Sequence, residues 1–512
     1  YSGIGKTSLI SELCIPIEEK KGVFLSGKFE QYQRNIPFSG ISQSFREFVR
    51  YLLSKEKSEI EKWRKDILAT VGSNGKVVID VIPELELILG TQSEVPEVAG
   101  EQAMNRFTYT FLQFVKVCAR IDHPIVLFLD DLQWADSGSL FLLEQILKEP
   151  DLFYFLVIGA FRDNEISHSS GFQFFLNNLD KENLSYNSIH LGNLGIDSIQ
   201  DLLIDTFHSN SKELKELTNL IYSKTNGNPF FTRQLLQTLY EQNLIYFQDQ
   251  KWSWQMEKIN KLTVSENVVD LMLDKIRKLP LQMQSLLGFA ACMGIQFKIT
   301  MLIKIFLAEN NIILQQLETC INEGLIIPIG DSYKIFSLGI GNREYYFEFL
   351  HDRIQQASYQ LISDRDKKEI HLKIGRHILE HSNEEELNDR LFDILEQINH
   401  SLELLGDEEK YTIAILNLRA GKQAKASVAY ISALQYFQNS LQLLSLNHCD
   451  KYYYELFECT LNIGETEFLL GNYSAANEYF EIGMTNAKTR LDKVKLFNLR
   501  IALFNSQGEY DK

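Results

Sequence analysis

The first residues of the chain have the spacing of a phosphate-binding loop. Gly3, Gly5, Lys6 and Thr7 follow the pattern G-x-x-x-x-G-K-[ST], except that its first glycine would precede Tyr1. In such a loop, small residues let successive backbone N–H groups turn toward phosphate oxygens, the lysine adds a positive charge, and the threonine hydroxyl binds Mg²⁺. We therefore expect a site for ATP or ADP with Mg²⁺, whose binding residues are Gly3, Ile4, Gly5, Lys6, Thr7 and Ser8.

Two aspartates could supply the acidic groups that this site needs. The apolar run at residues 125–129 ends at Asp130 and Asp131. A run without alternation is typical of a parallel strand buried on both faces, and open α/β sheets bind ligands at the carboxyl ends of their strands. We predict that Asp130 binds the metal and that Asp131 orients or deprotonates the attacking water. An ordinary strand end is the alternative interpretation.

An arginine ends the next apolar run. Residues 153–160 predict another buried strand, and Arg162 follows it. A planar cation at this point could bind the charge that develops on a transferred phosphoryl group. Arg162, Asp131 and Lys6 are therefore the predicted catalytic residues. The alternative for Arg162 is a surface ion pair with Asp163 or Glu165.

Structural elements of different kinds follow one another along the chain. Helical and strand-like segments alternate first, which predicts a doubly wound α/β nucleoside-triphosphatase core. Helices then dominate, and apolar stretches broken by glycines between residues 325 and 349 suggest a hairpin after a helix pair. The predicted domains are an α/β core at 1–185, an all-α lid at 186–275, a winged-helix-like region at 276–405 and helical repeats at 406–512.

The repeats are visible as recurring aromatic and small residues. Tyr430, Ala433 and Phe437 have the same spacing as the triplet 473, 476 and 480, and residues 508–510 restart the pattern, at offsets of 43 and 37 residues. Small residues at helix crossings with aromatics beside them are typical of stacked helical hairpins. The segment resembles tetratricopeptide repeats with long connections. An ordinary helical bundle is the alternative.

Four motifs, at residues 128–136, 159–165, 227–231 and 349–357, resemble the STAND class of signal-transduction ATPases. Within that class the chain is most similar to the AAA-type ATPase segment of large bacterial sensor kinases. These proteins often join a Ser/Thr-kinase-like domain, this ATPase, helical repeats, a GAF domain and a histidine kinase. The family's phosphate loop, acidic pair and arginine fall on the residues derived above.

The resemblance implies two further nucleotide contacts. Pro229 matches a proline that packs near the adenine. His351 and Asp352 match a Met-His-Asp motif, with Leu350 in place of methionine, whose histidine contacts the β-phosphate of ADP and holds a closed state. Taken alone, residues 227–229 are also an ordinary helix start, and a single histidine is more often structural.

Some residues near the predicted site have a structural role or no assigned role. Asp136 is expected to cap a helix that starts near residue 137, beside a packed Trp134. Lys28, Glu30 and Arg106 look like this subfamily's sequences, but no role follows from their chemistry. The two histidines outside any motif, His123 and His371, are expected to be structural or solvent-facing.

The amino-acid composition excludes some classes of binding partner. The net charge is −17 from 51 basic and 68 acidic residues, which argues against nucleic acid. The longest apolar stretch, at residues 152–161, is too short for a membrane span of ~20 residues. The six cysteines are far apart and lack metal spacing, which indicates free thiols in a reducing compartment, and we expect a cytoplasmic location.

The favoured function is a slowly hydrolysing ATP switch in a larger sensor kinase. Protein partners would bind the repeats, neighbouring kinase or sensor domains would flank the segment, and the family implies nucleotide-dependent self-association. The alternatives are a non-hydrolysing nucleotide-bound scaffold, or the ATPase segment of a transcription regulator or cyclase. The incomplete loop at Tyr1 suggests a cut chain, so we expect residues 1–512 alone to bind ATP poorly or aggregate.

Overall fold

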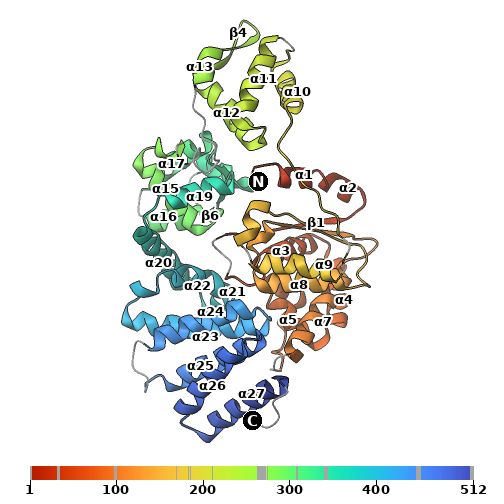
Figure 1. Cartoon of the computed structure of the whole chain (residues 1–512), viewed down its shortest axis with the longest axis vertical. Helices are drawn as coiled ribbons and strands as arrows, with labels where there is room; N and C mark the ends of the chain where they lie inside the picture. Colours follow the sequence, from red (N-terminus) through yellow and green to blue (C-terminus); the bar gives the residue numbers. More distant parts are fainter. Residues whose placement is uncertain are drawn as a thin grey trace. The chain divides into compact units, whose positions relative to one another are not determined.

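The computed structural model divides the chain into two compact units (Figure 1). Unit 1 contains residues 1–15, 162–164 and 186–367, and unit 2 contains 16–161, 165–185 and 368–512. The structure describes residues 3–31, 35–96, 101–168, 170–182, 184, 186–209, 212–261, 273, 275–306, 309–338, 344–445 and 451–507. The four-domain division predicted from the sequence stays a prediction.

A parallel sheet forms the α/β part of unit 2. Strands β1 (Val23–Lys28), β2 (Ile125–Asp130) and β3 (Phe155–Gly159) pair in the order β1-β2-β3. Every residue of β2 is buried, as its unbroken apolar run predicts. The predicted α/β class is therefore confirmed, with the two aspartates at the carboxyl end of the central described strand.

Strand β3 differs from the prediction. We expected it to be buried on both faces, but its side chains are partly exposed, and Leu156 keeps 54% of its surface accessible. The reason is its position, since β2 is the partner of β3 in the described sheet and β3 forms an edge. An apolar run therefore identified the strand but not its place in the sheet.

Helices surround this sheet. Helix α3 buries Ile41, Phe45, Phe48 and Leu52, a spacing that places them on one helical face. The helices of this part are α2 (Cys14–Glu19), α3 (Ser39–Leu53), α4 (Lys57–Val71), α5 (Gly75–Ile79), α6 (Glu86–Leu89), α7 (Glu101–Cys118), α8 (Ser137–Lys148) and α9 (Ser170–Lys181). Short 3₁₀ helices are η1 (Gly72–Asn74), η2 (Pro83–Leu85), η3 (Leu132–Trp134) and η4 (Asp163–His168).

The rest of unit 2 is helical, and its last part forms antiparallel hairpins. The elements are α20 (Asp364–Glu380), α21 (Glu384–Asp389), α22 (Leu391–Asn399), η6 (Leu402–Leu404), α23 (Asp407–Ala426), α24 (Tyr430–Ser445), α25 (Tyr453–Leu469), α26 (Tyr473–Asn486) and α27 (Arg490–Gln507). Helices α24 and α26 begin at Tyr430 and Tyr473, the first residues of the two recurring triplets. The third copy of the pattern, at 508–510, lies outside the described residues.

Glycines allow the two helices of each hairpin to approach closely. A Cβ atom on Gly421 of α23 would lie 2.5 Å from the ring of Phe437, and one on Gly464 of α25 would lie 2.6 Å from Phe480. Both phenylalanines are fully buried. The aromatic residues of the sequence repeat therefore fill equivalent positions, which confirms the helical repeat, while its assignment to the tetratricopeptide class stays a prediction.

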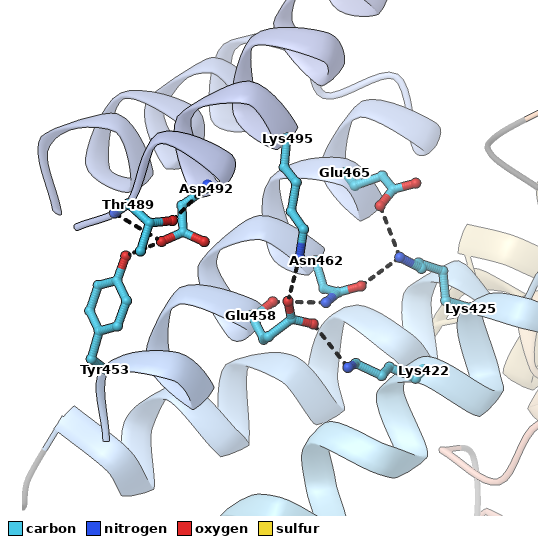
Figure 2. Close-up of polar contacts among 9 residues, drawn as sticks. All are labelled: Lys422, Lys425, Tyr453, Glu458, Asn462, Glu465, Thr489, Asp492 and Lys495. Carbon is cyan, nitrogen blue, oxygen red and sulfur yellow. Dashed lines mark hydrogen bonds and ion pairs between the residues drawn. The ribbon is translucent and has the colours of Figure 1, made fainter. Parts of the chain in front are cut away.

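Polar side chains link the first helices of successive hairpins, α23, α25 and α27 (Figure 2). Glu458 of α25 accepts hydrogen bonds from Lys422 of α23 at 2.9 Å and from Lys495 of α27 at 3.4 Å. Tyr453 donates to Asp492 at 2.6 Å, and Lys425 pairs with Glu465 at 2.9 Å. One face of the array is therefore connected by ion pairs, whereas the hairpins are packed by apolar groups.

Unit 1 contains helices, a hairpin and a small sheet. Its helices are α1 (Lys6–Ser11), α10 (Ile196–Phe207), α11 (Lys212–Thr225), α12 (Pro229–Glu241), α13 (Met256–Lys261), α15 (Leu281–Met293), α16 (Ile299–Phe306), α17 (Asn310–Asn322), α18 (Ile335–Leu338) and α19 (Asp352–Gln360), with 3₁₀ helix η5 (Gly330–Lys334). The strands are β4 (Ile245–Gln248), β5 (Lys251–Trp254), β6 (Gln296–Lys298), β7 (Ile326–Pro328) and β8 (Tyr346–Phe349).

Unit 1 contains strands that the sequence analysis did not predict. In the lid, which we expected to be all-α, β4 and β5 form an antiparallel hairpin. Asp249 and Gln250 at its turn both have positive φ, as a type I′ turn requires. Farther on, β7 and β8 pair as the predicted hairpin does, and β6 extends them to a sheet of order β6-β8-β7.

Cysteine and membrane predictions can also be compared with the structure. None of the described cysteines forms a disulfide, and those at 118, 292, 320 and 459 are buried; Cys449 lies outside the described residues. Burial raises the pKa of Cys459 to about 11, which makes it a poor nucleophile. Among the described helices, none combines the length and apolar character needed to cross a bilayer.

Candidate nucleotide site

The loop before helix α1 has the backbone of a phosphate-binding turn. Gly3 and Gly5 have φ values of 72° and 94°, and the helix begins at Lys6. Only glycine adopts this conformation without strain. A Cβ on Gly5 would meet no atom within 4 Å, so open space lies beside the loop. These features fit a nucleotide phosphate, with Thr7 and Ser8 exposed in the first turn of α1.

Helix α12 holds the start of this loop. The backbone N–H of Phe230 donates to the carbonyl of Gly3 at 3.2 Å, and a Cβ on Gly3 would lie 2.6 Å from that of Phe230. Asn228 caps the helix by accepting from Phe231 N–H at 3.1 Å, with Pro229 in the first helical position. The predicted helix start is confirmed, and it brings Pro229 next to a residue that contacts the phosphate loop.

His351 lies against the same helix start. Its ring centroid is 4.5 Å from that of Phe230. Its Nδ1 accepts from the backbone N–H of Arg353 at 3.1 Å and so caps helix α19. The structural role that the sequence left open for this histidine is therefore present, in a position adjoining the phosphate loop through Phe230.

Arg162 binds a different carboxylate from those considered in the sequence. Its guanidinium forms an ion pair with Asp352, the first residue of α19, and both side chains are largely buried. Asp163 instead lies 3.1 Å from His190, and Glu165 accepts from Gln133 at 3.2 Å. Asp352, which lies in unit 1 with Arg162, is thus a partner that the sequence did not suggest, and it makes the pair largely buried.

The acidic pair lies in unit 2. Asp130 and Asp131 are both buried at the end of β2, and Asp131 has φ 56°, a left-handed conformation that Asp tolerates better than most residues. Asp131 accepts from Gln133 at 3.0 Å and lies 3.6 Å from Lys28 Nζ. Lys28 ends β1 in register with Asp130. Asp130 and Asp131 are therefore buried, and Asp131 contacts polar side chains, whereas an ordinary strand end would be exposed.

Asp136 has the predicted capping role. It accepts from Ser139 N–H at 2.9 Å at the start of α8, and also from Phe38 N–H at 3.1 Å. Burial raises the pKa of Asp136, while these hydrogen bonds oppose the rise. Trp134 is buried in η3.

The predicted site residues thus form two groups. In unit 1 the phosphate loop, Pro229, His351 and Arg162 are connected through Phe230 and Asp352; in unit 2 lie Asp130 and Asp131. The sequence reasoning missed the contacts of Phe230 and Gln133, whose chemistry gave no signal. Lys28 could have been found, because it ends the strand that neighbours β2.

The residues that the sequence analysis named without a functional role contact other protein groups in the structure. The ring of His123 lies 5.7 Å from Trp63, and buried His371 has Nδ1 2.7 Å from Gln397 Oε1. Arg106 donates to the carbonyl of Pro96 at 2.6 Å. Within the described residues, no group of three or more His, Cys, Asp or Glu side chains is arranged to hold a metal ion.

Comparison with known proteins agrees with the nucleotide interpretation. Residues 1–158 match the model of the AAA ATPase domain. The chain is 29% identical, over 95% of its length, to hybrid signal transduction histidine kinase G of Dictyostelium discoideum. It is 21% identical, over 70% of its length, to the peroxide stress-activated histidine kinase mak3 of Schizosaccharomyces pombe. The chain spans 17% of the length of each of these relatives.

One solved structure that aligns with the chain is described as a STAND protein. The crystal structure of PH0952 from Pyrococcus horikoshii, a Signal Transduction ATPase with Numerous Domains (STAND) with a tetratricopeptide repeat sensor, aligns with a TM-score of 0.41 and 15% identity. The alignment covers 98% of this chain and 64% of that one. The two kinase relatives come from an amoeba and a yeast, so the likeness is not confined to bacteria. The chain therefore carries an AAA ATPase domain in its first 158 residues and is related to signal-transduction histidine kinases.

Proposed function

We propose that the chain is an ATP-dependent switch module, a slowly hydrolysing ATPase of the STAND type within a larger sensor kinase. The observation that supports this most strongly is the chain of contacts in unit 1. The phosphate loop is bonded to Phe230, whose ring contacts His351, and Asp352 beside it pairs with Arg162. Residues that could distinguish ATP from ADP are thus connected to the loop that would hold both.

Each residue has a proposed part in this activity. The N–H groups of Gly3 to Thr7 and the Lys6 ammonium bind phosphate oxygens, and Arg162 binds the γ-phosphate. Mg²⁺, held by Thr7 and Asp130, would neutralise phosphate charge, and Asp131 would orient the attacking water. His351 contributes a difference in affinity between nucleotide states, without which no ligand can shift a conformational equilibrium.

The helical repeats would receive the signal from a protein partner. Their packing is local from hairpin to hairpin, which is typical of arrays that bind partners along an extended face. Kinase or sensor domains elsewhere in the protein would provide the output, and nucleotide-dependent self-association would couple the two. The kinase names of the relatives support this context.

Nucleotide binding is tested by Lys6→Ala in the full-length protein. Losing the ammonium should weaken ATP binding at least about tenfold, because a charge-assisted phosphate contact is worth 1.4 kcal/mol or more. Lys20→Ala, which changes an exposed lysine after α2, is the matched control. Isothermal titration calorimetry measures both. If the two variants bind ATP equally well, the phosphate loop is not the nucleotide site.

Hydrolysis separates the switch from a nucleotide-bound scaffold. Asp131→Asn keeps the shape and tolerates the left-handed backbone, but it removes the base. ATP turnover should fall by about 100-fold or more while ATP affinity is retained. Asp151→Asn, in the exposed turn after α8, is the control. Equal turnover in wild type and Asp131→Asn would favour the scaffold.

A further inference from the structure

A single side-chain amide connects two carboxylates that follow neighbouring strands. The Nε2 atom of Gln133 donates to Oδ1 of Asp131 at 3.0 Å and to Oε2 of Glu165 at 3.2 Å. Asp131 follows β2 directly, and Glu165 lies in η4, the first element after β3. All three residues belong to unit 2. The amide therefore bridges the segments that follow β2 and β3.

The chemistry of the bridge requires a hydrogen-bond donor at this position. Ionised carboxylates only accept hydrogen bonds, and an amide nitrogen carries two hydrogens, so the nitrogen can serve both carboxylates at once. Gln133 keeps 1% of its surface accessible, which limits the access of water to these contacts. An apolar side chain of similar size could fill the same space but could make neither bond.

The backbone that carries Gln133 is tied to both strands. It lies in η3, where the N–H of Trp134 donates to the carbonyl of Asp131 at 2.9 Å. One residue before it, the N–H of Leu132 donates to the carbonyl of Ala160, just after β3, at 3.0 Å. The amide is therefore presented from a fixed backbone, and it can fix the orientation of the carboxylate that it contacts.

We propose that Gln133 is a positioning residue for ATP hydrolysis and that Glu165 anchors it. By holding Oδ1, the amide fixes the plane of the Asp131 carboxylate, and with it the direction in which that carboxylate accepts a hydrogen bond from the attacking water. Lys28 lies 3.6 Å from Oδ2, but an ammonium acts as a point charge and sets this direction less strictly. The inference rests on the proposed function, which assigns the attacking water to Asp131.

Replacing the amide by an apolar side chain of similar size tests this role in the full-length protein. Gln133→Met should lower kcat about 10- to 100-fold, because a misplacement of about 1 Å has an effect of this size. The affinity for a non-hydrolysable ATP analogue should stay unchanged, because the amide acts only on the attacking water. Gln173→Met, at an exposed position of α9, is the matched control. An unchanged kcat, or an affinity that falls as far as kcat does, overturns the proposal.

Two substitutions of Glu165 test the anchor. In Glu165→Gln an amide oxygen can still accept from Gln133, so kcat should remain near that of wild type. Glu165→Ala removes the acceptor and should lower kcat about tenfold. Equal losses of kcat in the two variants contradict the anchoring role. Because Glu165 is partly exposed, this pair also covers the case in which Gln133→Met does not fold.

A transition-state analogue distinguishes positioning from a purely structural role. The affinity for ADP with aluminium fluoride, which mimics the phosphoryl group in transfer, should fall in Gln133→Met roughly in parallel with kcat. Thermal unfolding of the same variant measures its stability. A lower Tm with the affinities for the ATP analogue and the transition-state analogue reduced equally would show that the bridge is only structural.

A double-mutant cycle separates this inference from the function on which it rests. In the Asp131→Asn background, Gln133→Met should cause no further loss of kcat, because it acts through Asp131. A further loss as large as that in wild type overturns the positioning role while hydrolysis stands. If wild type does not hydrolyse ATP, or if Asp131→Asn retains full turnover, the proposed hydrolysis itself fails.

Discussion

At the scale of single residues, Asp136 joins two segments of the α/β core. Its carboxylate caps α8 through Ser139 and accepts the N–H of Phe38, which lies 98 positions earlier. The N-cap follows from the local sequence, because aspartate before a helix is a strong signal. The contact with Phe38 does not, because no spacing rule connects two segments so far apart.

Replacing Asp136 measures both contacts. Asp136→Ala should lower the free energy of unfolding by about 2–3 kcal/mol, because it removes the helix cap and an acceptor for a buried N–H. Asp136→Asn should cost about half as much, since one side-chain oxygen can still accept a hydrogen bond. Urea unfolding at neutral pH gives the values, with the exposed Asp151→Ala as control. Equal losses in both variants would contradict the role of the second oxygen.

The pH dependence of the wild type relative to Asp136→Asn has a defined sign. Burial raises the folded-state pKa of Asp136 above its ordinary value of 3.8. Between these two pKa values the folded state binds the proton more tightly, so rising pH lowers stability. The advantage of the wild type over Asp136→Asn should therefore decrease as the pH rises above 3.8. An advantage that grows instead would mean that the hydrogen bonds outweigh burial.

At the scale of elements, the helical array combines an apolar interior with ion pairs between first helices. Burial disfavours the charge of Glu458, but Lys422 and Lys495 outweigh it and hold the pKa of Glu458 below its usual value. The repeating aromatic residues predicted the hairpins from the sequence. The ion pairs could not be predicted, because surface-type residues show no periodicity that reveals which helix lies opposite.

The stability of the array should depend on Glu458. Glu458→Gln should lower the free energy of unfolding by about 1 kcal/mol, a modest cost because both lysines are half exposed and can regain water. Differential scanning calorimetry compares it with Glu478→Gln, an exposed site on α26.

The pH dependence of this difference follows from the lowered pKa of Glu458. A carboxylate with a lowered pKa in the folded state stabilises the fold at pH values above its unfolded pKa of 4.5, and that stabilisation is lost as the pH falls through the folded pKa. The difference between wild type and Glu458→Gln should therefore vanish in acid; a difference that persists there would exclude the charge as its cause.

At the scale of the whole molecule, unit 2 contains both the parallel sheet and the helical array. The hydroxyl of Tyr436 in α24 donates to the carbonyl of Asn35 at 3.2 Å, and burial raises the pKa of Tyr436 well above its ordinary value. A Cβ on Gly138 at the start of α8 would lie 3.2 Å from that of Ala429. The first hairpin of the array thus packs on the core that carries Asp130 and Asp131.

A mutation that leaves a cavity in the helical array should therefore also destabilise the α/β core. Phe437→Ala removes a fully buried ring and should cost about 3–5 kcal/mol. Hydrogen exchange should speed up in β2 as well as in α24, because the first hairpin packs on the core that contains β2. The control Phe497→Ala, half exposed on α27, should cost less than about 1 kcal/mol. Loss of protection in the array alone would show that the parts unfold independently.

The sequence by itself determined the features that depend on neighbouring residues. Spacings of a few residues predicted the glycines of the phosphate loop, the buried run of β2 and the helix caps at Asp136 and Asn228. Only the tertiary structure decided that β3 is an edge of the described sheet, that Arg162 pairs with Asp352, and that Lys28 and Gln133 meet Asp131. Such pairs are made by packing between distant segments, and a single sequence does not record which segments meet.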